Sequence, residues 1–235
     1  MTKYFIIPAR GGSKGIKNKN LQKIEKFNLV EWSIIHALFL SSKKDRIIVS
    51  SDSEKILNIA NKYKVDAQKR THELSGDKVF TEPVMNYELS KHDIKNEDVI
   101  ILLQPTSPLR RKKTLLSSLN AVEKEGFDSS LTVKESHQFK WGIINDSTGI
   151  PLYKDRPRRQ DMEPEYVENG SIYITKYKNF VNSKKRISGK TKLIFSQPEE
   201  SVDIDNLTDL KITRSLSDDF AKEWKSFIKN LEVSN

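Results

Sequence analysis

The chain has 235 residues, of which 36% are hydrophobic and 31% are charged, so it is long and apolar enough to bury a core of its own. It has no cysteine, which excludes disulfides and thiolate metal sites. Its net charge of +9 is compatible with an anionic substrate, with nucleic acid, or with a lysine-rich solvated surface.

The sequence shows no sign of a membrane span or of a secretion signal. No apolar run approaches the ~18 residues that a membrane-spanning helix needs. The first residues lead directly into a strand pattern and lack the regions of a signal peptide. We therefore expect a cytoplasmic protein without a membrane partner.

The first predicted element is a short buried strand over residues 4–7, which ends at Pro8. The loop after it is rich in glycine and basic side chains, and it contains Ala9, Arg10, Gly11, Gly12, Ser13, Lys14, Gly15, Ile16, Lys17, Asn18, Lys19 and Asn20. Glycines allow positive φ angles and a close approach to a ligand, so backbone N–H groups can point at phosphate oxygens. The spacing fits neither the Walker pattern nor the dinucleotide fingerprint. The loop is either an ordinary turn or a phosphate site, and the preceding strand and the concentrated charge favour the phosphate site.

Strands and helices alternate along most of the chain. The predicted helices cover residues 29–41, 54–63, 81–92, 114–125 and 208–231, the last of them broken near Ser217. The predicted strands cover residues 4–7, 46–50, 65–68, 98–103, 129–133, 171–174 and 193–195. This alternation predicts a single α/β domain over residues 1–235, with a Rossmann-like, mostly parallel sheet flanked by helices.

The alternation is interrupted at about 137–168, where Pro, Arg, Asp and Glu are frequent and periodicity is weak. A loop of this length inside a compact domain is usually functional or an interaction arm. The basic run Arg156–Gln160 within it and the Asn169-Gly170-Ser171 turn after it form either a site for an acidic substrate or a solvated surface.

A second candidate site follows the most apolar strand. The loop over residues 104–110 contains two prolines, which stiffen it. In open α/β sheets ligands bind at the carboxyl ends of the strands, so Gln104 and Arg110 are candidates for polar contacts. The alternative is a rigid strand-to-helix turn that binds nothing.

Asp203 and Asp205 are the candidate metal ligands. In an extended segment, residues two apart point to the same side, so these carboxylates would share a face while Val202 and Ile204 pack behind them. Two close carboxylates repel each other unless a cation or a proton lies between them. In a nucleotide site that cation would be Mg²⁺, held by one or two carboxylates and by the substrate phosphates. The alternative is a solvated acidic loop, or a helix cap formed by Asp205.

Taken in order, these motifs resemble those of the acylneuraminate cytidylyltransferases, the CMP-sialic acid synthetase family. The matching segments are residues 7–15, 19–20 and 50–53, Arg70, Glu73–Leu74, Asp77, and residues 104–110, 158–161, 169–173 and 203–205. They extend over residues 6–210, and the ordered set is much more specific than any single segment.

The resemblance implies a reaction in which CTP and a free nine-carbon 2-keto sugar acid give a CMP-sugar and pyrophosphate. The anomeric hydroxyl would attack the α-phosphorus in line with the leaving pyrophosphate, which requires positioning and charge neutralisation. The implied nucleotide-binding residues are Ala9, Arg10, Gly11, Gly12, Ser13, Lys14, Lys19, Asn20 and Arg70. The implied catalytic residues are Arg10, Lys19 and Asp205. The implied sugar-binding residues are Gln104, Arg159, Gln160, Asn169 and Tyr173.

The resemblance also implies a metal ion and a partner subunit. Asp203 and Asp205 would carry Mg²⁺, with Asp205 the surer ligand. Family members are dimers in which an arm reaches into the partner's site, and residues of about 137–168 fit a protruding dimerisation arm. The resemblance thus predicts a homodimer that binds CTP and a sugar acid, and that binds no nucleic acid.

The identity of the sugar stays open. Many sialic acid enzymes carry an arginine just before the Asn-Gly turn, where this chain has Val167-Glu168, and some carry aromatic residues where it has Arg186-Ile187-Ser188. Neuraminic, legionaminic and pseudaminic acids are therefore all candidates, as is another sugar acid such as Kdo. Two alternatives from other classes are a basic nucleic-acid-binding protein, suggested by the net charge alone, and an inactive relative that binds nucleotide as a regulator.

Overall fold

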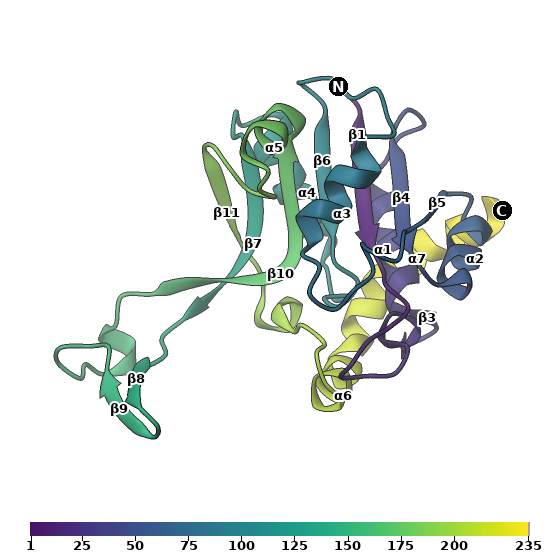
Figure 1. Cartoon of the computed structure of the whole chain (residues 1–235). Coiled ribbons are helices and arrows are strands. Elements are labelled where there is room, and N and C mark those ends of the chain that lie inside the picture. Colours follow the sequence, from purple (N-terminus) through teal and green to yellow (C-terminus); the bar gives the residue numbers. More distant parts are fainter. Residues whose placement is uncertain (235) are drawn as a thin grey trace.

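One seven-stranded sheet organises the computed structural model, which describes residues 1–234 (Figure 1). Its strands are β1 (Lys3–Pro8), β4 (Arg46–Ser51), β5 (Asp66–Lys69), β6 (Val99–Leu103), β7 (Ser129–Ser136), β10 (Glu165–Lys176) and β11 (Thr191–Phe195). Their order across the sheet is β11-β7-β10-β6-β1-β4-β5. All neighbouring strands pair in parallel except β10, which is antiparallel to both β6 and β7. The predicted α/β class with a mostly parallel sheet is confirmed.

Seven α-helices surround this sheet in the described part of the chain. They are α1 (Leu29–Leu40), α2 (Glu54–Lys62), α3 (Thr81–Leu89), α4 (Lys112–Glu123), α5 (Tyr177–Ser183), α6 (Leu207–Ser215) and α7 (Ser217–Ser234). Short 3-10 helices are η1 (Lys19–Leu21), η2 (Arg159–Asp161) and η3 (Pro198–Ser201). The predicted break near Ser217 is confirmed, whereas the sequence analysis missed α5 and the small hairpin of β2 (Lys23–Ile24) and β3 (Phe27–Asn28).

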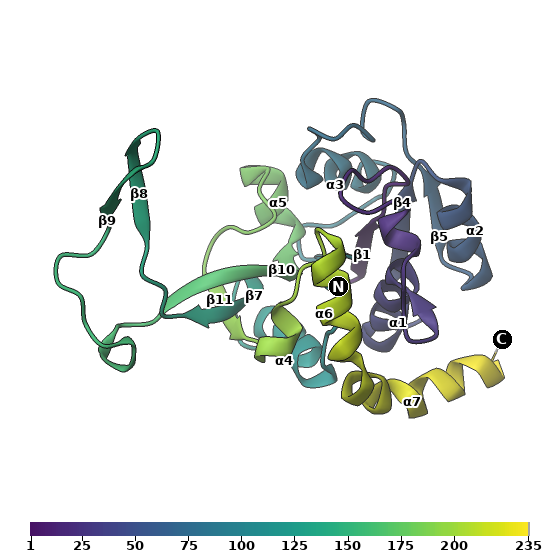
Figure 2. The ribbon, with the colours of Figure 1, turned by 90° about the horizontal axis from the view of Figure 1, so that it is seen from below.

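Alternate residues of the central strands feed two separate cores, because successive side chains of a strand point to opposite faces. Phe5 and Ile7 of β1 pack in the core that α1, α2, α4 and α7 cover. Tyr4 and Ile6 pack in the core that α3 and α5 cover. Figure 2 shows α3 and α5 on one side of the sheet and α1, α4 and α7 on the other.

None of the helices within residues 1–234 combines the length and the apolar character needed to cross a bilayer.

Capping side chains fix where two of these helices begin. Asn28 accepts a hydrogen bond from the Glu31 N–H, and the Glu31 carboxylate accepts one from the Asn28 N–H, which forms a capping box at the start of α1. Asn206 caps α6 in the same way, by accepting from the Thr208 and Asp209 N–H groups. The suggestion that Asp205 caps this helix is therefore wrong.

An arm projects from the sheet where β7 and the first half of β10 run beyond it (Figure 1). Its tip carries the antiparallel hairpin of β8 (Trp141–Asn145) and β9 (Thr148–Pro151). The predicted interruption at about 137–168 is confirmed as a protrusion, but the expectation of irregular structure throughout is wrong. The hairpin was missed because a half-buried strand is recognised in a sequence by alternating apolar and polar residues. Nearly every residue of β8 and β9 is exposed, so burial imposes no such pattern there.

Candidate active site

The candidate site lies at the carboxyl edge of the parallel strands, where the loops after β1 and β6 meet. A cavity of about 170 Å³ opens there on the side of the sheet that α3 covers. Its walls include Pro8, Arg10, Ser13, Lys19, Asn20, Arg70, Val79, Phe80, Thr81, Val84, Gln104, Pro105 and Thr106. The structure thus brings together residues predicted to bind the nucleotide with Gln104, which was predicted to bind the sugar.

Close packing, and not positive φ angles, explains two glycines of the basic loop. A Cβ atom added at Gly15 would lie 2.2 Å from the carbonyl oxygen of Asp205, and one added at Gly11 would lie 2.8 Å from the Cβ of Ser53. The Gly11 N–H also donates to Asp52 Oδ1 over 2.7 Å. The positive φ angle within the described loop belongs to Asn18, at 53°. Neither glycine has a positive φ angle; they allow the close approach of two other chain segments.

Two cations of this loop converge on one carboxylate. Arg10 forms an ion pair with Asp77 Oδ1, and Lys14 Nζ lies 3.0 Å from Asp77 Oδ2. The hydrogen bonds from Lys14 and from Arg10 lower the pKa of the Asp77 carboxyl, so it is an anion at neutral pH. The Arg10 guanidinium and the Lys14 ammonium group therefore already contact the same negatively charged group, the Asp77 carboxylate. A phosphate oxygen is the same kind of partner for both.

The third cation, Lys19, joins the basic loop to the predicted metal segment. Its Nζ donates to the Ile204 carbonyl oxygen over 2.7 Å and lies 3.1 Å from Asp205 Oδ1. Ile204 is fully buried, and its N–H donates to the Thr106 carbonyl oxygen, so the segment is anchored between two loops. Asp203 and Asp205 are exposed on either side of it. The predicted alternation of apolar and carboxylate side chains is present.

Arg70 is held from behind by a buried network. Its Nη2 and Nε groups donate to the carbonyl oxygen and to Oγ of Ser50, over 2.7 and 3.2 Å. Ser50 Oγ in turn donates to Glu88, a fully buried carboxylate that also pairs with Lys91 over 2.6 Å. Sequence reasoning missed Glu88, although a glutamate on the face of α3 that carries Val84 was a usable signal. This network fixes the Arg70 guanidinium at the cavity wall.

The other predicted nucleotide-binding residues divide into two groups. Asn20 Nδ2 donates to the Arg10 carbonyl oxygen over 2.9 Å, so this side chain supports the loop. Ala9 is fully buried and donates its N–H to Ser50. Gly12 has open space where a Cβ would be, and Ser13 lines the cavity.

Polar atoms also converge around Gly170, which has a φ of +74°. A Cβ there would meet Asp203 Oδ2 and Gln104 Oε1, both at 3.6 Å, and Ser107 Oγ at 3.7 Å. Ser107 Oγ donates to Asp203 over 3.3 Å. Asp203, a predicted metal ligand, and the candidate sugar-binding residue Gln104 thus face each other across a glycine.

The remaining predicted sugar-binding residues lie in different surroundings. The Asn169 side chain is buried and bonds to Thr132 Oγ1 and Ser196 Oγ, so it holds the strand irregularity at the Asn-Gly turn. The Tyr173 hydroxyl donates to Glu168 over 2.9 Å, and burial raises the pKa of this phenol. Arg159 and Gln160 are exposed on the arm, and the structure does not bring them into the cavity of their own chain. Arg110 is fully buried, so the expectation that it contacts a ligand is wrong.

Comparison with known proteins decides the family. The model of the cytidylyltransferase family matches residues 4–231. The chain belongs to this family. It is 34% identical over 85% of its length to N-acylneuraminate cytidylyltransferase A of Danio rerio, and it is 31% identical over 90% of its length to the CMP-N,N'-diacetyllegionaminic acid synthase of Legionella pneumophila. These relatives confirm the resemblance found in the motifs.

The lengths and folds of the relatives add two facts. The match covers 47% of the Danio rerio protein and 94% of the Legionella pneumophila protein, so the chain spans about half the length of the first of these curated relatives. A CMP-2-keto-3-deoxy-manno-octonic acid synthetase solved with CTP superposes with a TM-score of 0.64 at 14% identity, covering 92% of this chain and 98% of that one. At that identity the likeness establishes a shared fold.

The contact at Gly15 gives a test of the loop. Gly15→Ala should lower the free energy of unfolding by about 1–3 kcal/mol, because the new methyl group overlaps a backbone oxygen that cannot rotate away. Gly12→Ala, whose methyl group would meet open space, is the matched control and should change it by less than about 0.5 kcal/mol. Urea unfolding of the three proteins measures both values. Equal effects of the two substitutions would show that Gly15 is not in close contact with the carbonyl oxygen of Asp205.

Proposed function

We propose that this cytidylyltransferase transfers the cytidylyl group of CTP to a sugar acid of the nonulosonic type, in the cytoplasm, giving a CMP-sugar and pyrophosphate. The observation that carries the proposal is the meeting of three elements in one site: the basic loop, the Asp203–Asp205 segment and Gln104. The names of the relatives, which include neuraminate and legionaminate enzymes, support the same reaction class.

The basic loop supplies the charge that a triphosphate requires. Arg10 and Lys14 already converge on the carboxylate of Asp77, so a phosphate group can replace that carboxylate without a new arrangement of the loop. Lys19 lies deeper, with its side chain 16% exposed. It stands between the loop and Asp205, where a leaving pyrophosphate would develop negative charge. Arg70, fixed by Ser50, closes the opposite wall.

The carboxylates fit a magnesium ion bound together with the nucleotide. Asp203 and Asp205 offer only oxygen ligands and are both exposed, and Mg²⁺ is typically held by one or two carboxylates plus substrate phosphates. Within residues 1–234 no three His, Cys, Asp or Glu side chains are gathered for a metal ion, so phosphate oxygens would complete the coordination. When bound, the ion would neutralise phosphate charge and lower the pKa of a coordinated hydroxyl.

The acceptor is proposed to lie between Gln104, Tyr173 and the Asp203 carboxylate. Gln104 Oε1 and Asp203 Oδ2 lie close to the same point beside Gly170, so they can hold a sugar hydroxyl in a fixed orientation. Arg186 lies over the Tyr173 ring at 5.1 Å and pairs with Glu82 over 2.6 Å, which makes this wall polar. Neuraminic, legionaminic and pseudaminic acids all belong to the proposed class.

The deciding experiment is pyrophosphate release from CTP and Mg²⁺ with a panel of sugar acids. We expect turnover with at least one of N-acetylneuraminic, N,N'-diacetyllegionaminic and pseudaminic acid, and little with UTP or ATP. Turnover with Kdo alone would contradict the proposed class of acceptor but would still support cytidylyl transfer from CTP. Absence of turnover with every acid, together with salt-sensitive binding to DNA, would favour the nucleic-acid alternative.

The metal proposal predicts the effect of Asp205→Asn. The variant should fold like the parent protein, because the Asp205 side chain is 76% exposed. It should lose most turnover at every Mg²⁺ concentration, since a neutral amide is a poor ligand for Mg²⁺. Asp219→Asn, an equally exposed aspartate on α7, is the control and should keep full turnover. Normal turnover of Asp205→Asn at saturating Mg²⁺ would contradict the metal assignment.

Lys19 and Arg10 should differ in the kinetic constant that they affect. Lys19→Ala should lower kcat by about 10²–10³, by analogy with the loss of a donor that stabilises charge in the transition state. Arg10→Ala should mainly raise KM for CTP, because Arg10 is proposed to hold the bound triphosphate. Steady-state kinetics at varied CTP measures both. If Lys19→Ala changed only KM, the loop would serve CTP binding alone and the catalytic role proposed for Lys19 would be wrong.

The arm predicts a homodimer. The exposed apolar side chains near its tip are Trp141, Ile143, Ile144, Ile150 and Leu152, and such a group usually marks a protein interface. Light scattering should give twice the chain mass of 27.1 kDa, and the partner would bring Arg159 and Gln160 toward the site. Ile143→Glu should weaken the dimer, whereas Leu207→Glu, an exposed apolar residue of α6, should not. A fully active monomer would contradict this prediction.

A further inference from the structure

Arg110 is a completely buried cation whose direct partners are neutral. Its side chain has no solvent exposure and comes from the loop between β6 and α4. The guanidinium donates to the Gln104 carbonyl oxygen, to the Ser171 carbonyl oxygen over 3.0 and 3.3 Å, and to Ser33 Oγ over 3.3 Å. It also lies 3.2 Å from His36 Nδ1. None of the ion pairs found among the described residues includes Arg110.

Such an arrangement is costly, because a buried charge loses its hydration and here gains no opposite charge in contact. Burial lowers the pKa of Arg110 to about 9, and the more distant Asp203 and Glu200 oppose the shift, so the group is still charged at neutral pH. Burial and the nearby guanidinium push the pKa of His36 well below its ordinary value. The neutral imidazole can therefore offer Nδ1 as an acceptor. Every contact serves to orient the guanidinium.

The carbonyl groups that Arg110 binds belong to the residue after β6 and to the irregular middle part of β10, beside the proposed acceptor site. The Ser171 carbonyl oxygen also accepts the Gln104 N–H over 3.4 Å. Ser171 follows Gly170, where the pairing of β10 with β7 shifts register. Arg110 thus joins the end of β6 to the irregular part of β10 from inside the core. On the other side of this junction, the Gln104 side chain faces Asp203 across Gly170.

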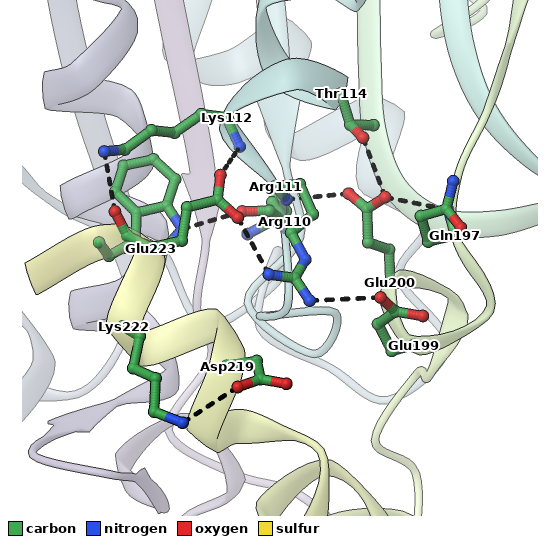
Figure 3. A network of polar contacts seen from close by, with 11 residues as sticks. Arg110, Arg111, Lys112, Thr114, Gln197, Glu199, Glu200, Asp219, Lys222 and Glu223 are labelled. Carbon is green, nitrogen blue, oxygen red and sulfur yellow. Dashed lines mark hydrogen bonds and ion pairs between the residues drawn. The ribbon is translucent and has the colours of Figure 1, made fainter.

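The same loop also contacts Glu200, which lies shortly before the proposed metal ligands Asp203 and Asp205 in the chain (Figure 3). The N–H of Arg111 donates over 2.8 Å to Glu200, a buried carboxylate that also accepts from Thr114 Oγ1 over 2.9 Å. Glu200 stands three residues before Asp203, so its position limits where that carboxylate can lie. Trp224 Nε1 donates to the Arg110 carbonyl oxygen over 3.1 Å and fixes the backbone at this point.

We propose that Arg110 is the positioning residue of the acceptor site, and that its buried guanidinium sets the placement of Gln104 relative to Asp203. This inference rests on the proposed cytidylyl transfer. Arg110 touches neither nucleotide nor sugar, so it acts only through the Gln104 and Ser171 carbonyl groups. The basic loop that holds the triphosphate shares none of the hydrogen bonds of Arg110 given above.

The test compares Arg110→Met, which removes the charge and the donors, with Arg110→Lys, which keeps the charge but loses the planar fork. We expect Arg110→Met to lower kcat/KM for the sugar acid by about 10–100-fold, because small displacements of positioning groups have effects of that size. The Kd for CTP should change by less than about threefold, since the loop is untouched. Arg110→Lys should fall between Arg110→Met and the parent protein.

Lys3→Met is the control, because this largely buried lysine pairs with Asp45 and Glu123 at the start of β1, the end of the strand that lies away from the site. It should lower the Tm but leave both kinetic constants unchanged. Kinetics of Arg110→Met like those of the parent protein, or an equal loss of CTP binding, would overturn the proposal. Failure of both Arg110 variants to fold would also overturn it, since the residue would then serve folding alone. Absence of turnover in the parent protein would instead count against the proposed function.

Discussion

The site depends on the contact between the basic loop and the backbone of the Ile204–Asp205 segment. These two parts of the chain are separated by most of its length, and they meet because Gly15 has no side chain to hold them apart. Lys19 then joins them with a hydrogen bond to the Ile204 carbonyl oxygen and an ion pair with Asp205. A single close approach thereby places the proposed phosphate-binding cations beside the proposed metal ligands, and the sheet edge provides the rigid support for both.

The charges of the site are balanced within the chain. Arg10 and Lys14 share Asp77, Lys19 faces Asp205, and Arg70 lies near Glu88 through Ser50. Without these carboxylates the clustered cations of the cavity would repel one another. The carboxylates therefore keep the cations in place before a ligand arrives. In this arrangement an incoming anion exchanges one partner for another and does not have to order a disordered group. Preorganisation of this kind lowers the entropic cost of binding.

The core beneath the site contains polar groups that hold separate segments of the chain in a fixed arrangement. Arg110, Asn169 and Glu200 are all buried, and each bonds to the backbone or to hydroxyl groups of a different segment. Together they join β6, β10 and the chain before Asp203, none of which is adjacent to the others in sequence. Buried polar groups that are fully bonded specify one arrangement of the segments that they join. These bonds hold in place the part of the proposed acceptor site where Gln104 and Gly170 face each other.

Elements with a local signal can be predicted from the amino-acid sequence. The apolar strand β6, the helix α1 and the break at Ser217 all appear close to where they were predicted. The basic loop and the two aspartates were also recognisable, because their order along the chain matches a family pattern. Other features follow only from the folded chain: β10 runs antiparallel, Arg110 turns inward, and Asp77 meets Arg10 across 67 residues. A long polar side chain turns inward only where distant segments supply its acceptors, and no local pattern records which segments those are.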